Sequence, residues 1–492
     1  GLSAGDPMAS VNKASLREEF AALKGQFEQH CAKGEVSAEL RALFEALLLL
    51  FELLMAVFLE KTTPKSSRNS GVPPSQTGQD GEDPTTPKPR TSATGQNPTH
   101  NRSDNTRTIE TLTTLPVEHC AHCGTDLSDA PCQGHERRTR IDIVFEKVIE
   151  HVEAEIKDCP HCGERTKAAF PSHMPGPLQY GLGIRAFVLN LLVAQMVSLK
   201  RVQQLLNSLI GQVLSQATLL GYVLQLHRAL ERWEQEAIEA LLKQPTIHVD
   251  ETSLRVDRAK QWIHVYAGGA ITLKFLHPKR GLEAIEAINL IPRYGAVIIH
   301  DCWASYLSYD HCGHGLCGSH LTRELTFVIE ANNYRWAARM KRLLLETRKQ
   351  VANSTHKCLS ADEYLKLTKR YRVILARGAK ELPPIPPRQD GKRGRVAKSD
   401  AHNLWERLAR HEAAVLLFAK RPEVAFTNNR AERDLRMSKV KQKVSGCFRT
   451  RQYAEAYCRI SSYLQTMAYR GYNPLVAIQM ALSGELSAGG GE

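Results

Sequence analysis

The chain has 492 residues, which is too long for one hydrophobic core and predicts three or more domains. Lys and Arg number 65 against 52 Asp and Glu, and the net charge of +13 favours a polyanionic partner, with nucleic acid as the first candidate. Twelve cysteines in a chain of this length argue against a disulfide scaffold. No signal peptide is recognisable, so we expect a reducing, cytoplasmic location.

Residues 8–60 are predicted to be helical. Leu40, Leu47 and Leu54 recur every seven residues, which predicts self-association through a short coiled coil and hence a homodimer or higher homo-oligomer. Packing of this helix on its own chain is the alternative. Charged residues interrupt the apolar stretch, so no membrane span is expected. Residues 61–112 are rich in Pro, Ser, Thr, Gly and Asn, and predict a disordered linker.

Two Cys-x-x-Cys pairs follow within residues 113–170. Each pair presents two sulfurs to one side of a turn, and two such turns complete a tetrahedral Zn²⁺ site. The segment between the pairs alternates apolar and polar residues like a β-hairpin. The sequence therefore predicts a zinc ribbon that binds one structural Zn²⁺ through Cys120, Cys123, Cys159 and Cys162.

Residues 175–245 read as three amphipathic helices, with Ser198 and Ser215 as candidate N-caps. The second and third helices have helix-turn-helix spacing, with Gly211 in the turn. The pattern predicts either a helix-turn-helix-like DNA-binding segment or an ordinary helical bundle.

From residue 246 to 326 the order is three strands, helix, strand, helix, strand, which predicts a mixed sheet of the ribonuclease-H type. Asp250 lies in the middle of the first strand and Asp301 at the end of the fourth. These strands are neighbours in such a sheet, so the two carboxylates approach each other. Because adjacent carboxylates repel without a cation, the pair argues for a divalent metal. Glu251 is expected on the opposite face from Asp250.

Glu432 sits early on a helix crowded with basic residues, within residues 423–484. A solvated amphipathic helix with one salt-bridged acid is the plain interpretation. The two aspartates leave a magnesium site incomplete, however, and a third carboxylate carried on a helix would complete it. The surrounding polar and basic residues would then contact DNA: Asn428, Asn429, Arg430, Arg433, Lys439, Lys441, Lys443 and Arg449. The two asparagines are also expected to cap the start of this helix.

Asp301 and Glu432 are too far apart in the chain for one crossover. Residues 327–422 are mostly helical, so we expect an all-helical insertion between the two parts of the catalytic core, 246–326 and 423–484. A Pro-rich loop within it carries five basic residues and is expected to reach DNA: Arg388, Lys392, Arg393, Arg395 and Lys398.

These motifs together resemble a transposase of the insertion sequence 66 family, over roughly residues 113–484. The resemblance is carried by "VDETSLRV", "HPKRG", "VIIHDCWASY", "CGSHLTREL" and "FTNNRAERDLRMSKVKQKVSGCFRT". It implies a DDE transposase whose acidic triad is Asp250, Asp301 and Glu432. Cys317 and His320 match a Cys-x-x-His motif of related transposases, which either binds metal or holds the fold; we expect the structural role.

The resemblance implies a bacterial enzyme that is associated with the nucleoid and binds two kinds of DNA, the terminal inverted repeats of its element and the target DNA. It would cleave and join strands with two Mg²⁺ ions, or Mn²⁺, and could require accessory transposition proteins. Two alternatives stay open: a ribonuclease-H-like nuclease without joining activity, and a non-catalytic DNA-binding regulator derived from a transposase.

Overall fold

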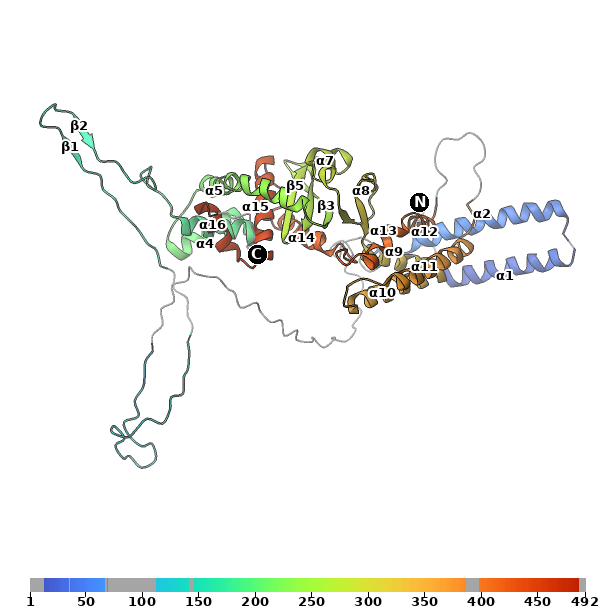
Figure 1. Cartoon of the computed structure of the whole chain (residues 1–492), viewed down its shortest axis with the longest axis horizontal. Coiled ribbons are helices and arrows are strands. Elements are labelled where there is room, and N and C mark those ends of the chain that lie inside the picture. Colours follow the sequence, from blue (N-terminus) through green and yellow to red (C-terminus); the bar gives the residue numbers. More distant parts are fainter. Residues whose placement is uncertain are drawn as a thin grey trace, which may run out of the picture.

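The computed structural model describes residues 13–34, 36–66, 69, 112–140, 146–385 and 398–485. Figure 1 shows a central body of sheet and helices, with a helical hairpin projecting from one end and extended arms from the other.

The centre of the body is a five-stranded mixed sheet with the order β5-β4-β3-β6-β7. The first three strands pair antiparallel, and β6 and β7 continue from β3 in parallel. A tight turn at Asp257 and Arg258, both with positive φ, joins the first two strands. The predicted pairing of the first and fourth strands is confirmed. The strands are β3 (Thr246–Val256), β4 (Ala259–Gly268), β5 (Ile271–His277), β6 (Val297–His300) and β7 (Gly313–Leu316).

Two C-terminal helices pack on this sheet, α14 (Asn429–Ser445) against β3 and β4 and α15 (Arg451–Tyr469) against β5. On the chain between β5 and β7 lie α7 (Leu282–Ile288), the short 3-10 helix η3 (Ile291–Arg293) and α8 (Ala304–Leu307).

The helical segment before the sheet shares one hydrophobic core with it, and does not form a core of its own. Val202 and Leu219 belong to the same buried cluster as Ile247 in β3 and Tyr463 in α15. Gly211, with φ of +64°, ends α4 (Leu199–Ile210), and Ser215 caps α5 (Gln216–Ala229) because its side chain accepts the backbone N–H of Thr218. Ser198 occupies the N-cap of α4 without a side-chain hydrogen bond. The elements are α3 (Leu182–Leu189), the π-helix η2 (Asn190–Ala194), α4 (Leu199–Ile210), α5 (Gln216–Ala229), α6 (Glu231–Leu242) and, from the C-terminus, α16 (Pro474–Ser483).

Between β7 and α14 the chain is helical, as predicted, and builds a second buried core around Trp336, Tyr371 and Leu404. Most of the basic loop predicted to reach DNA lies outside the described residues, and Lys398 at its end pairs with Glu406. The helices are α9 (Gly318–Asn332), α10 (Arg335–Asn353), α11 (Ala361–Glu381), α12 (Asp400–Arg410) and α13 (Glu412–Lys420).

The N-terminal region forms two helices, α1 (Lys13–Ala32) and α2 (Ala38–Thr62), where the sequence predicted one. The chain turns after Gly34, which has φ of +73° and ends the first helix, and Ser37 caps the second. The helices pack antiparallel, with stacked rings at Phe20–Phe51 and Phe27–Phe44. This pairing leaves the heptad leucines on the outside: Leu40, Leu47 and Leu54 are 50%, 58% and 64% exposed. Most of the predicted linker, 61–112, lies outside the described residues.

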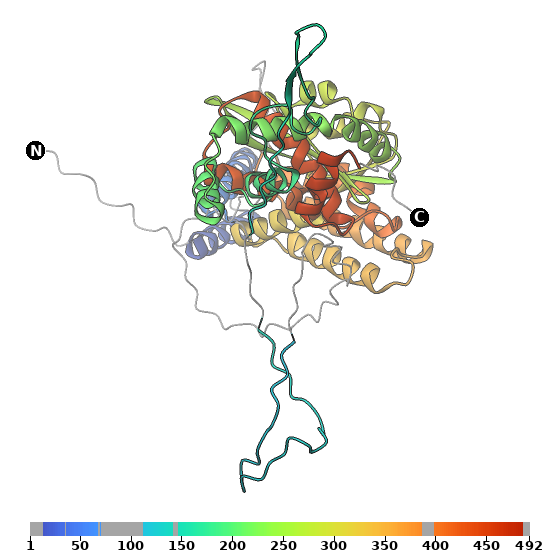
Figure 2. The same ribbon diagram turned by 90° about the vertical axis from the view of Figure 1, so that its left-hand side faces the viewer.

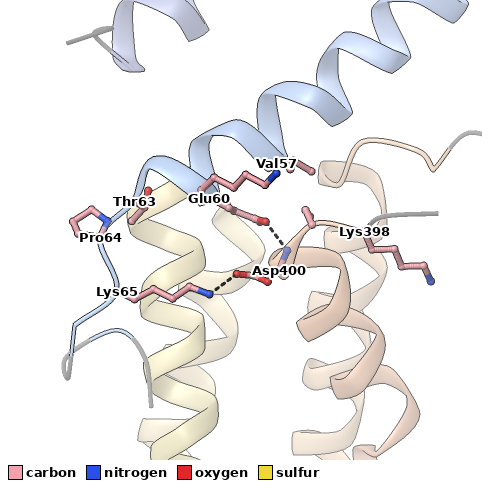
Figure 3. A pocket seen from close by; sticks show the side chains of 9 residues that line it. Val57, Glu60, Thr63, Pro64, Lys65, Lys398 and Asp400 are labelled. Atoms are coloured by element: carbon pink, nitrogen blue, oxygen red, sulfur yellow. Dashed lines mark hydrogen bonds and ion pairs between the residues drawn. The ribbon is translucent and has the colours of Figure 1, made fainter. Parts of the chain in front are cut away.

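The C-terminal end of α2 docks on the helical insertion (Figure 3). The Glu60 carboxylate accepts hydrogen bonds from the backbone of Asp400 and Ala401 at the start of α12, and from the Asn332 side chain. Lys65 pairs with the Asp400 carboxylate at 3.0 Å. A cavity of about 450 Å³ lies between these elements. Among the described residues, Ala38–Lys61 is long and apolar enough to cross a membrane by length and composition, which alone is weak grounds for a membrane role.

Candidate active site

Asp250 and Asp301 lie side by side at the junction of β3 and β6. The two strands pair in parallel with His248 opposite Ile299, so the same register places Asp250 level with Asp301, two residues further along each strand. Asp301 directly follows β6, and its Oδ1 accepts the backbone N–H of Trp303 at 3.1 Å, which fixes the carboxylate at the strand end.

The environment of Asp250 disfavours its negative charge. Burial and the charge of Glu251, with smaller contributions from Asp301 and Glu432, raise the pKa of Asp250 to about 8, although its Oδ1 accepts the backbone N–H of Glu251. A carboxylate in this state gains from a nearby cation. The charges of both other members of the predicted triad, Asp301 and Glu432, contribute to this shift.

Glu251 is held apart from this site by partners of its own. Its Oε1 accepts a hydrogen bond of 2.6 Å from Arg280, and its Oε2 accepts one of 2.7 Å from the Tyr306 hydroxyl. Arg280 also stacks over the Trp303 ring, 4.3 Å from its centroid. The Glu251 carboxylate therefore has two side-chain partners, whereas Asp250 accepts the backbone N–H of Glu251.

Helix α14 is attached to β3 at both of its ends. At the start, the buried amide of Asn428 donates to the Val249 oxygen at 2.7 Å and lies 3.0 Å from His248 Nδ1. Burial lowers the pKa of His248 to about 4, so this ring is neutral and its Nδ1–H donates to the amide oxygen. After the helix, Phe448 exchanges backbone hydrogen bonds with Arg255 and Asp257. The helix that carries Glu432 is therefore fixed along the strand that carries Asp250.

The loop from β7 into α9 supports the same helix end. Cys317 Sγ accepts the backbone N–H of Asn428 at 3.1 Å, and Gly318 N–H donates to the Phe426 oxygen at 2.8 Å. A Cβ at position 318 would lie 2.2 Å from the Phe426 ring, so this close approach requires glycine. Cys317 and His320, predicted as a motif, are thus placed directly against the start of the Glu432 helix.

Glu432 faces two basic side chains of α9. Its Oε1 lies 3.6 Å from His320 Nδ1 and 3.9 Å from Arg323 Nη2. Burial opposes protonation of His320, but its contact with the Cys317 sulfur and the Glu432 charge outweigh burial and raise its pKa to about 9. Sequence reasoning missed Arg323, although its position one helical turn after His320 puts it on the same face of α9.

The predicted DNA-contacting residues divide into three groups. Asn428 is 1% exposed, and Arg430 donates to the backbone oxygens of Gly269 and Ile271 and stacks on Tyr469. Both side chains are therefore used to hold α14, which does not support their predicted role toward DNA, and Asn428 makes no side-chain cap either. Lys441 is half-buried beside Phe448. The exposed members are Asn429, Arg433, Lys439, Lys443 and Arg449.

The buried side of α14 holds a polar network that the sequence did not reveal. Asp434 accepts hydrogen bonds from Thr272 at 2.6 Å and from Tyr469 at 2.7 Å, and its charge acts on the fully buried Lys274. Burial lowers the pKa of Lys274, and Asp434 opposes that shift. These residues lie on three separate elements, so no local spacing could have indicated them.

The two cysteine turns form, but the structure does not bring them together. The backbone oxygens of Cys120 and Cys159 accept the N–H of Gly124 and Gly163, two glycines with positive φ, so that both segments form the same type of tight turn. The second turn joins β1 (Ile156–Asp158) to β2 (Arg165–Lys167). Residues 112–140 and this hairpin extend to opposite sides of the molecule in both views (Figures 1 and 2).

The predicted β-hairpin between the two turns is also not formed by residues 136–140 and 146–155, which contain no strand and are mostly exposed. Their apolar side chains find no partner surface to pack on, so alternation alone does not make a strand here. The donor chemistry still fits zinc: hydrogen bonds from Thr125 and contact with Cys120 lower the pKa of Cys123 to about 7, and backbone hydrogen bonds lower that of Cys159. The shared four-cysteine site remains a prediction.

The three acidic residues present the oxygen ligands that Mg²⁺ prefers. Asp250 offers a buried carboxylate without a basic partner in direct contact, and Glu432 Oε1 is a buried atom without a hydrogen-bond partner among the described residues. The three carboxylates therefore fit a divalent cation. The junction of β3 and β6 would hold it from one side and helix α14 from the other.

A family model described as "Transposase IS66 family" matches residues 177–456, more than half of the chain. The match begins before α3 and ends within α15, so it includes the sheet, the insertion and the Glu432 helix. No curated protein matches the chain significantly.

Proposed function

Because the chain belongs to the transposase IS66 family, we propose that it is a DDE-type DNA transposase that cleaves and joins DNA strands at Asp250, Asp301 and Glu432. Membership of the family supports a role in DNA transposition, with DNA binding and use of divalent metal in general. The observation that carries the specific proposal is the parallel register of β3 and β6, which sets two carboxylates level, with the Glu432 helix fixed along the same strand.

In this mechanism Asp250 and Asp301 hold the metal ions from the sheet and Glu432 from α14. Two Mg²⁺ ions, when bound, would activate water and stabilise the leaving 3′ oxygen, and would then align the freed 3′-hydroxyl for attack on a second strand. The chain's own part is to hold the three carboxylates in a fixed frame. Asn428 positions α14 against Val249, and Arg280 neutralises Glu251 so that it does not compete for the cations.

DNA would be bound along the exposed basic side of α14. Arg433, Lys443 and Arg449 are exposed there, and partial burial lowers the pKa of Lys439 although the charge of Asp250 opposes this. Lys439 lies seven residues after Glu432, two turns along the same helix face. It would therefore contact the phosphate nearest the reacting bond, and the other residues the flanking backbone.

The terminal repeats of the element would be held by the cysteine-turn arms, with one Zn²⁺ joining Cys120, Cys123, Cys159 and Cys162, and by the α4–α5 segment. Both arms are exposed, and α4 and α5 have the helix-turn-helix spacing joined by Gly211. Self-association through α2 would place two copies on the two ends of one element.

The experiment uses the full chain, DNA carrying the element's ends, and Mg²⁺. Each of three variants should reduce the rate of strand cleavage at least about 100-fold and should retain DNA binding without Mg²⁺: Asp250→Asn, Asp301→Asn and Glu432→Gln. Asp257→Asn is the matched control, because it removes one carboxylate from the turn after β3, where asparagine also accepts the positive φ. Two active triad variants would show that the assigned site is wrong.

A nuclease that does not join strands would carry the same three carboxylates. Pre-cleaved ends with a free 3′-hydroxyl separate the two functions, because a transposase joins them to target DNA and a nuclease does not. Joined products that disappear in Asp250→Asn would support the transposase, and cleavage without any joined product would support the nuclease.

A further inference from the structure

Cys317, His320 and Glu432 form a cluster of metal-ligand types beside the proposed acidic site. Their ligand atoms, one sulfur, one ring nitrogen and one carboxylate oxygen, lie within 4.8 Å of one another. Cys317 is 1% exposed, while His320 and Glu432 are partly buried. The two segments that meet here are separated by more than 100 residues, so the cluster is a product of the fold.

The spacing suits a tetrahedral zinc-type ion. With metal bonds of about 2.0–2.2 Å to nitrogen and oxygen and about 2.3 Å to sulfur, the ligand atoms of such a site lie about 3.3–3.7 Å apart. His320 Nδ1 and Glu432 Oε1 are 3.6 Å apart. The ligand atoms of the whole group lie within 4.8 Å of one another, so binding would draw them slightly closer together; Cys317 and His320 already share the first turn of α9.

The cluster also has unsatisfied polar atoms. His320 Nδ1 and Glu432 Oε1 are buried and have no hydrogen-bond partner within the described part of the chain. A shared cation would satisfy both. Cys317 Sγ accepts the backbone N–H of Asn428, a contact that fixes the position of the sulfur beside the other two ligands. Arg323, 3.9 Å from Glu432 Oε1, is the opposing charge, and it must turn away when the ion binds.

We propose that Cys317, His320 and Glu432 bind a thiophilic divalent cation of the Zn²⁺ type. The thiolate selects against Mg²⁺, which prefers oxygen ligands. Three protein ligands leave the fourth position open to water or to a DNA phosphate. Because Glu432 also belongs to the proposed acidic site, the ion withdraws that carboxylate from the catalytic metals. Zn²⁺ therefore inhibits strand cleavage, a consequence that rests on the proposed function.

Co²⁺ is the probe for the site, because a cobalt–thiolate bond gives an absorption band that oxygen and nitrogen ligands do not. The cysteine turns would give the same band, so the experiment uses the full chain with Cys120→Ser and Cys159→Ser as its background. In that background we expect one bound Co²⁺ per chain with a thiolate band. Cys317→Ser and His320→Asn should each weaken Co²⁺ binding by at least about 10-fold.

Cys312→Ser is the matched control, since Cys312 is also buried and donates from its sulfur to the Tyr294 oxygen. It should leave the band unchanged. His320→Asn tests the site even where Cys317→Ser does not fold, as judged by circular dichroism. A background protein without the band, or a band that survives both changes, would overturn the inference. Loss of cleavage in Asp250→Asn tests the proposed function separately. A failure of the metal-site inference can therefore be distinguished from a failure of the proposed function.

Discussion

The side-chain amide of Asn428 donates a hydrogen bond of 2.7 Å to the backbone oxygen of Val249, the residue directly before Asp250. The contact joins the helix that carries the third carboxylate to the strand that carries the first. The same amide also forms a hydrogen bond with the His248 ring. The Asn428 amide, the His248 ring and the Val249 oxygen thus satisfy one another. The distance between Glu432 and Asp250 is consequently fixed by this contact as well as by packing.

Asn428→Ala should reduce strand cleavage and lower the free energy of unfolding by about 1–3 kcal/mol, because it leaves buried partners without hydrogen bonds. Urea unfolding and Mg²⁺-dependent cleavage measure the two effects. Asn429→Ala is the control, because Asn429 is the next residue and is exposed. Equal effects of the two changes would show that the contact with Val249 has no positioning role.

Stability without divalent metal should fall as the pH rises. The pKa of Asp250 is raised to about 8 in the folded protein against about 3.9 in an unfolded chain, so the folded state binds more protons between these pH values. In EDTA, the Tm of the parent protein should therefore decrease from pH 5 to pH 8, and less so in Asp250→Asn. At pH 8, Mg²⁺ should raise the Tm of the parent but not of Asp250→Asn.

Glu60→Gln provides the control for this effect. Burial also raises the pKa of Glu60, which lies at the α2–α12 contact away from the triad. That variant should flatten the pH dependence in part and keep the response to Mg²⁺. If Mg²⁺ stabilised Asp250→Asn as much as the parent, Asp250 would not be a metal ligand.

The exposed basic residues after Glu432 should contact phosphates without reading bases. Changing Lys443 and Arg449 together to Ala should weaken binding to all DNA sequences about equally. It should make the slope of log K against log salt shallower by up to about two units, because each phosphate contact contributes about 0.9 by counterion release. Lys366→Ala with Lys369→Ala removes two exposed charges from α11 and serves as the control. A change of preference at particular base pairs would contradict a backbone contact.

The exposed heptad face of α2 should mediate self-association. Leu47→Glu with Leu54→Glu should lower the mass measured by light scattering, because burying charge in a coiled-coil seam is costly. Both leucines point away from α1, so the change should not disturb the helical hairpin. Leu23→Glu, at an equally exposed site on α1, is the control. An unchanged mass would mean that the leucine repeat has another role.

Zinc should join the two cysteine turns. Cys120→Ser or Cys159→Ser should each remove about one Zn²⁺ per chain, since either change breaks a four-thiolate site. In the parent, removal of zinc by a chelator should increase the radius of gyration measured by small-angle scattering, because the arms would separate. Metal analysis that finds the same zinc content in Cys120→Ser would contradict a shared site.

Local pattern was enough to predict the strands, their pairing and the position of Asp250 beside Asp301, because alternation and buried apolar runs report directly on a sheet. It was not enough for contacts between distant segments. The hydrogen bond from the Asn428 N–H to Cys317 Sγ joins residues 111 positions apart, and no spacing within either segment indicates it. The hydrogen bonds of Arg430 to the β4–β5 turn were missed for the same reason, and this arginine was assigned to DNA.

The N-terminal error had a different origin. Gly34 and Ser37 are ordinary stop and start signals for helices, but the leucine repeat dominated the interpretation and one helix was predicted across them. In the arms, alternation of apolar and polar residues predicted strands where the chain has no surface to pack against. Periodicity is reliable where a core exists to receive the apolar face, and these arms are exposed.

The common core of the α3–α6 segment and the sheet constrains how such a protein can diversify. Val202 and Leu219 pack within the same cluster as the strand that carries Asp250, so exchange of this segment between relatives would disturb the sheet that holds the proposed acidic site. The exposed arms at residues 112–140 and 146–170 carry no such penalty. If the arms bind the ends of the element, as proposed, new end sequences would be accommodated most readily by changes in the arms, while the helices next to the sheet would change together with it.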